Sequence, residues 1–179
     1  FDASRDLERI GVVNQTTMLA TETREIAKVI RQALVDRYGN SMIKHHYAET
    51  SDTLCYATNE NQNATYALIG EGADLALVVG GYNSSNTSHL VELCQEAMPT
   101  YFIKNADDIS SSRTIRHYDL EERQEITSEN WLKGDRPTDV VLTCGASCPD
   151  AVVDQVLLRV LSFFPSVKSV DEVLAAYPE

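Results

Sequence analysis

The sequence predicts an α/β protein in which parallel strands alternate with helices. The clearest sign lies in residues 76–89 (ALVVGGYNSSNTSH), where an apolar run meets two glycines and small polar residues before a helical pattern begins. The same order returns in residues 138–150, and a weaker version lies at residues 8–17. Such alternation favours a parallel sheet with right-handed crossovers. With 179 residues, 43% of them hydrophobic, the chain can form one large domain or two small ones.

The first third of the chain predicts two strands and two helices. The strands are expected at residues 6–14 and 43–48. A helix over residues 22–38 has threonines available as caps, one apolar stripe, and Gly39 to end it. A second helix is expected to begin at Cys55 and to run through Ile69. His45 and His46 would face opposite ways in a strand, so we do not expect them to form a metal pair.

The rest of the chain predicts further strand–helix units. Strands are expected at residues 74–80, 99–104 and 140–143, and helices at residues 84–97, 105–109, 149–164 and 171–177. Residues 110–133 lack a clear period, and we expect an exposed excursion there. Its basic residues, Arg113, Arg116 and His117, are expected to be solvated.

Hydroxyl and amide side chains follow three of the predicted strands. In an open α/β sheet the carboxyl ends of the strands bind ligands, and helix N-termini there hold anions. These neutral donors suit a phosphate or diphosphate held without lysine. Each turn could also be only a helix cap, which is the commoner role of such residues. The side chains concerned are Thr16, Thr17, Ser84, Ser85, Asn86 and Ser147.

The charge of the chain restricts its partners. The net charge is −12, from 15 basic and 27 acidic residues. Such a chain is a poor ligand for nucleic acid or an anionic membrane, and no apolar stretch has transmembrane length. We therefore expect neither nucleic acid nor membrane as a partner.

The four cysteines have different expected roles. Cys55 stands where a helix is expected to begin, a position that lowers a thiol pKa and suits reactivity or metal ligation, although a buried structural role is also open. Cys94 lies on an apolar helix face and is expected in the core. Cys144 and Cys148 do not have the spacing of a zinc CxxC motif. Four cysteines in an α/β chain indicate a reducing compartment rather than a disulfide framework.

Four sequence blocks resemble one family. The blocks NQTTMLATET, SDTLCYATNENQ, VVGGYNSSNTSHL and CGASCPDAVVD occur in this order. Together they resemble the LytB/IspH family, the 4-hydroxy-3-methylbut-2-enyl diphosphate reductases of the non-mevalonate isoprenoid pathway, closest to the plant and cyanobacterial branch. The resemblance covers nearly the whole chain.

The resemblance implies three α/β lobes around a central 4Fe–4S cluster held by three cysteines. It implies Cys55 as a cluster ligand, Thr16 near the alcohol end of the substrate, and diphosphate contacts from Ser84, Ser85, Asn86 and Ser147. The implied reaction is reductive dehydroxylation to isopentenyl and dimethylallyl diphosphate. Residues 1–50 would complete the second lobe, residues 51–164 would form the third, and residues 165–179 would pack back on the first.

The chain also departs from the family pattern. The other two cluster cysteines, the phosphate-side histidines and the proton-relaying glutamate should lie upstream of Phe1. We therefore expect a C-terminal portion of a longer enzyme, inactive by itself. Relatives commonly carry small or hydroxyl residues where Cys144 and Cys148 stand; these are simple substitutions or a local redox or metal site. The alternative function is a non-catalytic α/β module that binds a phosphorylated ligand, and a plain anion-binding domain of another family is a third.

The resemblance further implies an electron donor of the ferredoxin or flavodoxin type. Such donors are acidic, as this chain is, so docking would need a local basic patch. The candidates are Lys104, Arg113, Arg116 and Lys133, which could equally be scattered solvated charges. The implied compartment is the plastid stroma or the bacterial cytoplasm.

Overall fold

The computed structural model describes residues 1–179 except 14, 49–55, 134–136, 169–171, 174 and 176–179. The chain divides into two compact units, Phe1–Ala67 and Leu68–Glu179, and we describe each by itself. The lobe boundaries expected from the resemblance belong to a longer three-lobed arrangement and stay predictions.

Unit 1 is mostly helical. It contains α1 (Ala3–Asp6), α2 (Ala20–Tyr38), α3 (Ile43–His46) and the first part of α4 (Tyr56–Glu71). The short strands β1 (Ile10–Gly11) and β2 (Tyr47–Ala48) pair in parallel.

Two expectations for this unit are wrong in part. The strand expected over residues 6–14 shrinks to β1, and most of the strand expected over residues 43–48 is the helix α3. Its last histidine is fixed locally, because the ring of His46 stacks on Tyr38 and its Nδ1 lies 2.7 Å from the carbonyl oxygen of Glu8. The helix expected over residues 22–38 is confirmed as α2, and the N–H of Gly39 donates to the oxygen of Val35 at its end.

A buried glutamine joins α4 to the start of α2 within unit 1. Gln62 is 1% exposed, and its Oε1 accepts a hydrogen bond of 3.1 Å from the N–H of Ala20. Its Nε2 donates to the carbonyl oxygen of Met18, also at 3.1 Å. Both ends of the amide are therefore satisfied, as a buried polar group requires. These two bonds fix residues 18–20, which directly follow the turn that contains Thr16 and Thr17.

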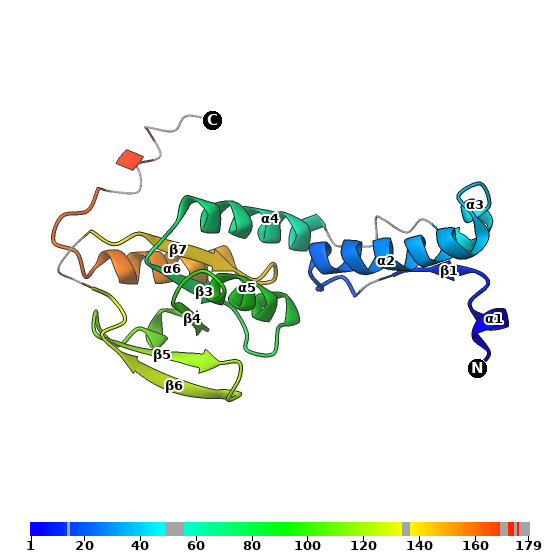
Figure 1. Cartoon of the computed structure of the whole chain (residues 1–179). Coiled ribbons are helices and arrows are strands. Elements are labelled where there is room, and N and C mark those ends of the chain that lie inside the picture. Colours follow the sequence, from blue (N-terminus) through cyan, green and yellow to red (C-terminus); the bar gives the residue numbers. More distant parts are fainter. Residues whose placement is uncertain (14, 49–55, 134–136, 169–171, 174, 176–179) are drawn as a thin grey trace. The chain divides into compact units, whose positions relative to one another are not determined.

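Unit 2 is built on a five-stranded sheet in the order β6-β5-β4-β3-β7, which Figure 1 shows strand by strand. The strands are β3 (Leu75–Val79), β4 (Thr100–Ile103), β5 (Thr114–Asp119), β6 (Gln124–Glu129) and β7 (Val140–Cys144). β3 pairs in parallel with β4 and with β7, whereas β5 and β6 are antiparallel. The expected parallel α/β arrangement is confirmed for the β4-β3-β7 part.

Helices cover both faces of the parallel strands. Every residue of β3 is buried, which is typical of a central strand. Leu75, Leu77 and Val79 form one core cluster with Val156 and Val160 of α6 (Asp150–Leu161). α5 (Ser85–Gln95) contacts β3, β4 and β7, and its buried residues lie outside that cluster, so it covers the other face. Cys94 is 0% exposed on α5, which confirms its expected place in the core.

The expected excursion at residues 110–133 is wrong, because β5 and β6 form a hairpin that extends the sheet. His117 is 8% exposed and bonds to Ser128, so the expectation that it is solvated is wrong. Arg113 and Arg116 are exposed as expected, although Arg116 also pairs with buried Asp108. The hairpin is difficult to predict from the sequence because its outer face is polar. Most of the helix expected at residues 171–177 lies outside the described residues.

Candidate functional site

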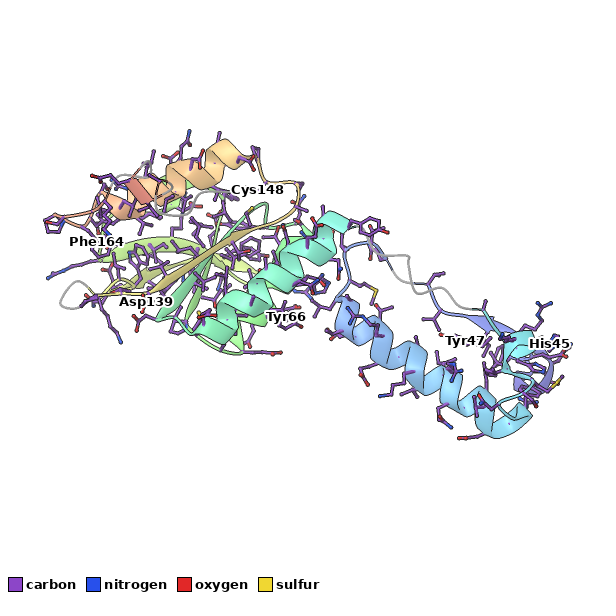
Figure 2. All side chains as sticks on the ribbon, turned by 90° about the horizontal axis from the view of Figure 1, so that it is seen from above. His45, Tyr47, Tyr66, Asp139, Cys148 and Phe164 are labelled. Carbon is purple, nitrogen blue, oxygen red and sulfur yellow. The ribbon has the colours of Figure 1, made fainter. Side chains whose placement is uncertain are left out.

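The carboxyl ends of β3, β4 and β7 meet at one edge of the sheet in unit 2. A pocket of about 200 Å³ lies there. It is lined by Gly80, Gly81, Lys104, Ser147, Cys148, Pro149 and Val152. Figure 2 shows Cys148 where β7 leads into α6, at the opposite end of β7 from Asp139. This is the edge at which parallel α/β sheets bind ligands.

Two glycines let the first turn of α5 approach the strand ends closely. A Cβ at Gly80 would lie 2.6 Å from Oγ1 of Thr87, and a Cβ at Gly145 would overlap the same atom. The N–H of Gly145 donates to the oxygen of Val79 at 3.0 Å, which ties the two strand ends together. Thr87 therefore lies where only glycine neighbours leave room for it. Sequence analysis missed this role of Thr87, although the two glycines were visible.

Ser84 is the N-cap of α5. Its Oγ accepts hydrogen bonds from the N–H of Thr87 at 3.3 Å and from the hydroxyl of Thr87 at 3.0 Å. The capping role that the sequence left open therefore applies to Ser84. Ser85, the first residue of the helix, is exposed. The free N–H groups and the dipole of this helix end favour an anion.

The side-chain amide of Asn86 is buried and has no hydrogen-bond partner among the described residues. Its side chain is 5% exposed, and neither Oδ1 nor Nδ2 has a partner among the described residues. Its Nδ2 lies beside Gly145, 3.8 Å from the position of a Cβ there. A buried polar group left unpaired costs about 1–3 kcal/mol. An amide kept in this state beside a helix N-terminus has donors available for a bound ligand.

The turn after β7 brings Ser147 and Cys148 to the pocket. The N–H of Cys148 donates to the oxygen of Gly145 at 2.8 Å, which closes the turn. Ser147 is exposed within it and lines the pocket. The thiol of Cys148 donates to the carbonyl oxygen of Pro149 at 3.8 Å, and burial raises the pKa of both Cys144 and Cys148. Both are therefore thiols at neutral pH.

The lysine that lines the pocket is already engaged. Nζ of Lys104 lies 2.7 Å from Oε1 of Glu125 and 4.1 Å from the ring centre of Tyr82. The backbone N–H of Lys104 donates to Oδ2 of Asp108 at 2.8 Å. Burial, followed by the charge of Asp108, raises the pKa of Tyr82. The charged side chain of Lys104 at the end of β4 is therefore already paired within the protein.

Two other predicted site residues are not part of the described unit 2. Thr16 is exposed in a turn of unit 1, and the hydroxyl of its neighbour Thr17 is buried without a partner among the described residues. Cys55 lies outside the described residues. Within unit 2, the structure brings Asn86 beside the turn that carries Ser147, with Ser84 and Ser85 on the same helix end.

The described residues do not by themselves fit a metal cluster. Across the part of the chain that the structure describes, no three His, Cys, Asp or Glu side chains are grouped to hold a metal ion. Cys144 and Cys148 are two thiols, and Cys94 is enclosed by the core. Among the described helices, none has the length and apolar character needed to cross a bilayer.

Comparison with known proteins gives one family. Residues 2–161 match the family model described as LytB protein. The chain is 43% identical over 163 residues to a 4-hydroxy-3-methylbut-2-enyl diphosphate reductase of Thermosynechococcus vestitus. This match covers 90% of the present chain and 40% of that relative. A reductase of the same name from Gloeobacter violaceus is 44% identical over 161 residues, with 89% and 38% covered.

A solved structure has a similar fold. It is the E-1-hydroxy-2-methyl-but-2-enyl-4-diphosphate reductase from Plasmodium falciparum, with a TM-score of 0.55 and 23% identity. The match covers 88% of this chain and 40% of that one. The chain thus spans about 40% of the length of the curated relatives named here.

Proposed function

Because this chain belongs to the LytB family, we propose that it supplies the diphosphate-binding part of a 4-hydroxy-3-methylbut-2-enyl diphosphate reductase. The complete enzyme would remove the allylic hydroxyl of its substrate with two electrons and two protons, giving isopentenyl and dimethylallyl diphosphate. The cyanobacterial relatives support a bacterial cytoplasm or a plastid stroma as the compartment.

The observation that carries the proposal is the unpaired, buried amide of Asn86. In the proposed complex its Nδ2 donates to a diphosphate oxygen, together with N–H groups of the first turn of α5. The hydroxyl of Ser147 donates from the pocket wall, and that of exposed Ser85 donates from the start of α5. The proton of the Ser84 hydroxyl is available because its oxygen serves as the cap acceptor. Neutral donors and a helix dipole can offset diphosphate charge in this way.

For the cluster, we propose that Cys55 provides one thiolate ligand to a 4Fe–4S centre whose other ligands come from outside this chain. In sequence Cys55 immediately precedes α4, and a helix N-terminus stabilises a thiolate. Thr16 is proposed to lie near the substrate hydroxyl. Iron and sulfide analysis after anaerobic reconstitution of this chain alone should find no stable stoichiometric cluster. A stable cluster would contradict the need for outside ligands.

The electron donor is proposed to be a ferredoxin or flavodoxin. Of the basic residues considered for its docking, Lys104 is paired with Glu125 and Arg116 with Asp108. Both are therefore less available to an acidic partner than the sequence implied. Arg113 and Lys133 remain the candidates of this set.

Diphosphate binding is tested on the chain itself. Titration calorimetry with inorganic diphosphate should show binding that Asn86→Ala weakens at least tenfold, about 1.4 kcal/mol. Asn105→Ser is the matched control, because Oδ1 of Asn105 already accepts from the N–H of Asp107 and serine preserves such a cap. Failure of the wild-type chain to bind, or equal affinity in Asn86→Ala, would contradict the proposed site.

The reductase is tested in a chimera in which this chain replaces the matching segment of the Thermosynechococcus vestitus relative. We expect the chimera to consume a reduced electron carrier only when substrate is present. The alternative function, a non-catalytic module that binds a phosphorylated ligand, predicts retained diphosphate binding without turnover in a chimera that carries its cluster. That result would overturn the enzyme proposal and leave the diphosphate site standing.

A further inference from the structure

We propose that Cys144 and Cys148 form a reversible disulfide that changes the shape of the pocket edge and weakens anion binding there. The disulfide is argued from the geometry of these two residues alone, and its effect on diphosphate rests on the proposed function. The pair is a site of covalent regulation rather than part of the binding machinery.

The fold brings the two thiols together at a tight turn. Cys144 is the last residue of β7, and the N–H of Cys148 bonds back to the oxygen of Gly145 at 2.8 Å. The two cysteines stand four residues apart across this turn, and both side chains pack against the same core cluster. A disulfide needs Cβ atoms about 3.5–4.5 Å apart, and the closed turn between Cys144 and Cys148 limits how far apart their Cβ atoms can lie.

The pair is reachable by a small oxidant, whereas Cys94 is not. Cys144 and Cys148 are half-buried, and Cys148 lines the pocket. Cys94 is 0% exposed, and burial raises its pKa to about 11. Between the paired cysteines stand only glycine, alanine and serine, so the turn has no large side chain to displace when it tightens.

The thiols have distinct roles in the exchange. Cys148 lines the pocket, so it is the thiol that a small oxidant reaches first. The Cys148 thiolate attacks a low-molecular-mass disulfide such as glutathione disulfide, and one glutathione thiolate leaves. The sulfur of Cys144, after loss of its proton, then attacks Cys148 and releases the second glutathione. The pair loses two electrons and two protons, and glutathione disulfide is reduced to two thiols.

The turn is coupled to the anion site through Gly145. This residue lies against Thr87 of α5 so closely that a Cβ would overlap it, and the Nδ2 of Asn86 is next to it. A disulfide that shifts the turn must therefore move either Ser147 or the first turn of α5. Packed interiors transmit such shifts because they contain little free space. We expect diphosphate affinity to fall at least fivefold on oxidation.

Mass spectrometry tests the disulfide directly. Tryptic peptide 134–159 contains both cysteines and no other, since Arg136 precedes a proline. After treatment of the chain with glutathione disulfide, this peptide should lose the mass of two hydrogens and regain it with dithiothreitol. Cys144→Ser should instead accumulate a glutathione adduct on Cys148, while Cys94→Ser should behave as wild type. Persistent glutathione adducts on wild-type Cys148, or a peptide that stays reduced, would overturn the proposal.

Calorimetry with inorganic diphosphate tests the switch separately. The reduced and oxidised forms of the wild-type chain should differ at least fivefold in affinity, and the double variant Cys144→Ser, Cys148→Ser should be insensitive to oxidant. Equal affinities of the two forms would overturn the switch but leave the disulfide. If the reduced chain binds no diphosphate, the proposed function fails, and the mass spectrum still decides whether the disulfide forms.

Discussion

Two regions at the carboxyl edge of the unit 2 sheet differ in whether their buried polar groups are hydrogen-bonded. Where β3 and β7 end, the amide of Asn86 is buried and unpaired among the described residues. Where β4 ends, beside the β5–β6 hairpin, buried Asp108 accepts from the N–H of Lys104 and from Arg116. Lys104 in turn pairs with Glu125. We infer from this difference that the paired groups maintain the fold, whereas the amide of Asn86 is left for the proposed ligand.

Asp108 and Asn86 both lose contact with water, and burying a polar group in this way costs free energy. A buried carboxylate is tolerated when its hydrogen bonds are satisfied, and Asp108, 1% exposed, meets that condition. The side-chain amide of Asn86 is removed from water without gaining a hydrogen bond, so it does not stabilise the fold unless a ligand binds there. Substitutions at the two regions should therefore separate stability from binding.

The largest effect is expected where the two strand ends meet. Gly145→Val places a branched side chain into Thr87, and we expect a loss in the free energy of unfolding of about 3 kcal/mol or more. Urea unfolding followed by circular dichroism measures it. Gly70→Ala is the matched control, because no atom lies within 4 Å of a Cβ there and the residue sits inside α4; it should stabilise by about 0.5–1 kcal/mol. Equal stability of Gly145→Val and wild type would show that Thr87 is not confined.

Asp108→Asn should come next. An amide cannot accept from both the N–H of Lys104 and Arg116 as the carboxylate does, so we expect a loss of about 1–3 kcal/mol in unfolding free energy. Diphosphate affinity should stay within about twofold, or ~0.4 kcal/mol. The control is Asp107→Asn at the exposed neighbouring residue. If Asp108→Asn weakened diphosphate more than Asn86→Ala does, the division between structural and binding groups would be wrong.

The parallel part of this sheet could be predicted because its signals are local. Residues 74–80, 84–97, 99–104, 140–143 and 149–164 were predicted as the elements that became β3, α5, β4, β7 and α6. Their strands are apolar runs, and their helices begin after small polar or proline residues. The β5–β6 hairpin was not predicted, because its strands carry many polar residues and His117 looks solvated until Ser128 is placed beside it.

The site was predictable only in its residue types. The sequence nominated Asn86 and Ser147 as donors at strand ends, but it could not show that Thr87 fills the space beside Gly80 and Gly145. The sequence also could not show that the Oγ of Ser84 accepts the capping hydrogen bond from the N–H of Thr87. Those facts depend on the distance between strands that are far apart in the sequence. The proposed roles of Cys55, which lies outside the described residues, and of Thr16, which is exposed in unit 1, stay predictions.

Ser84→Ala separates the two roles of the α5 N-terminus. Loss of the cap should reduce the unfolding free energy by about 1 kcal/mol, because the N–H of Thr87 loses its acceptor. Diphosphate affinity should fall less than in Asn86→Ala, and Ser84→Ala combined with Asn86→Ala should weaken binding severely. Ser84→Asp, which retains a capping oxygen, should recover stability but not affinity, because its charge repels the anion. Affinity of the double variant within about twofold of wild type, ~0.4 kcal/mol, would mean that this turn is only a cap.

The smallest effect concerns His117 and the paired region. Its ring is buried with Nε2 2.8 Å from Oγ of Ser128, and burial lowers its pKa, against a smaller opposing effect of Asp119. Below the ordinary histidine pKa of about 6.5, the unfolded chain therefore takes up a proton that the folded chain does not. Stability from this group is complete above that pKa and is lost as the pH falls toward the lowered folded value. Urea unfolding at pH ~7 and pH ~5.5 should accordingly show a smaller acid-dependent loss in His117→Gln than in wild type, since glutamine can bond to Ser128 without titrating. An equal or larger loss in the variant would show that burial of this ring does not couple the hairpin to pH.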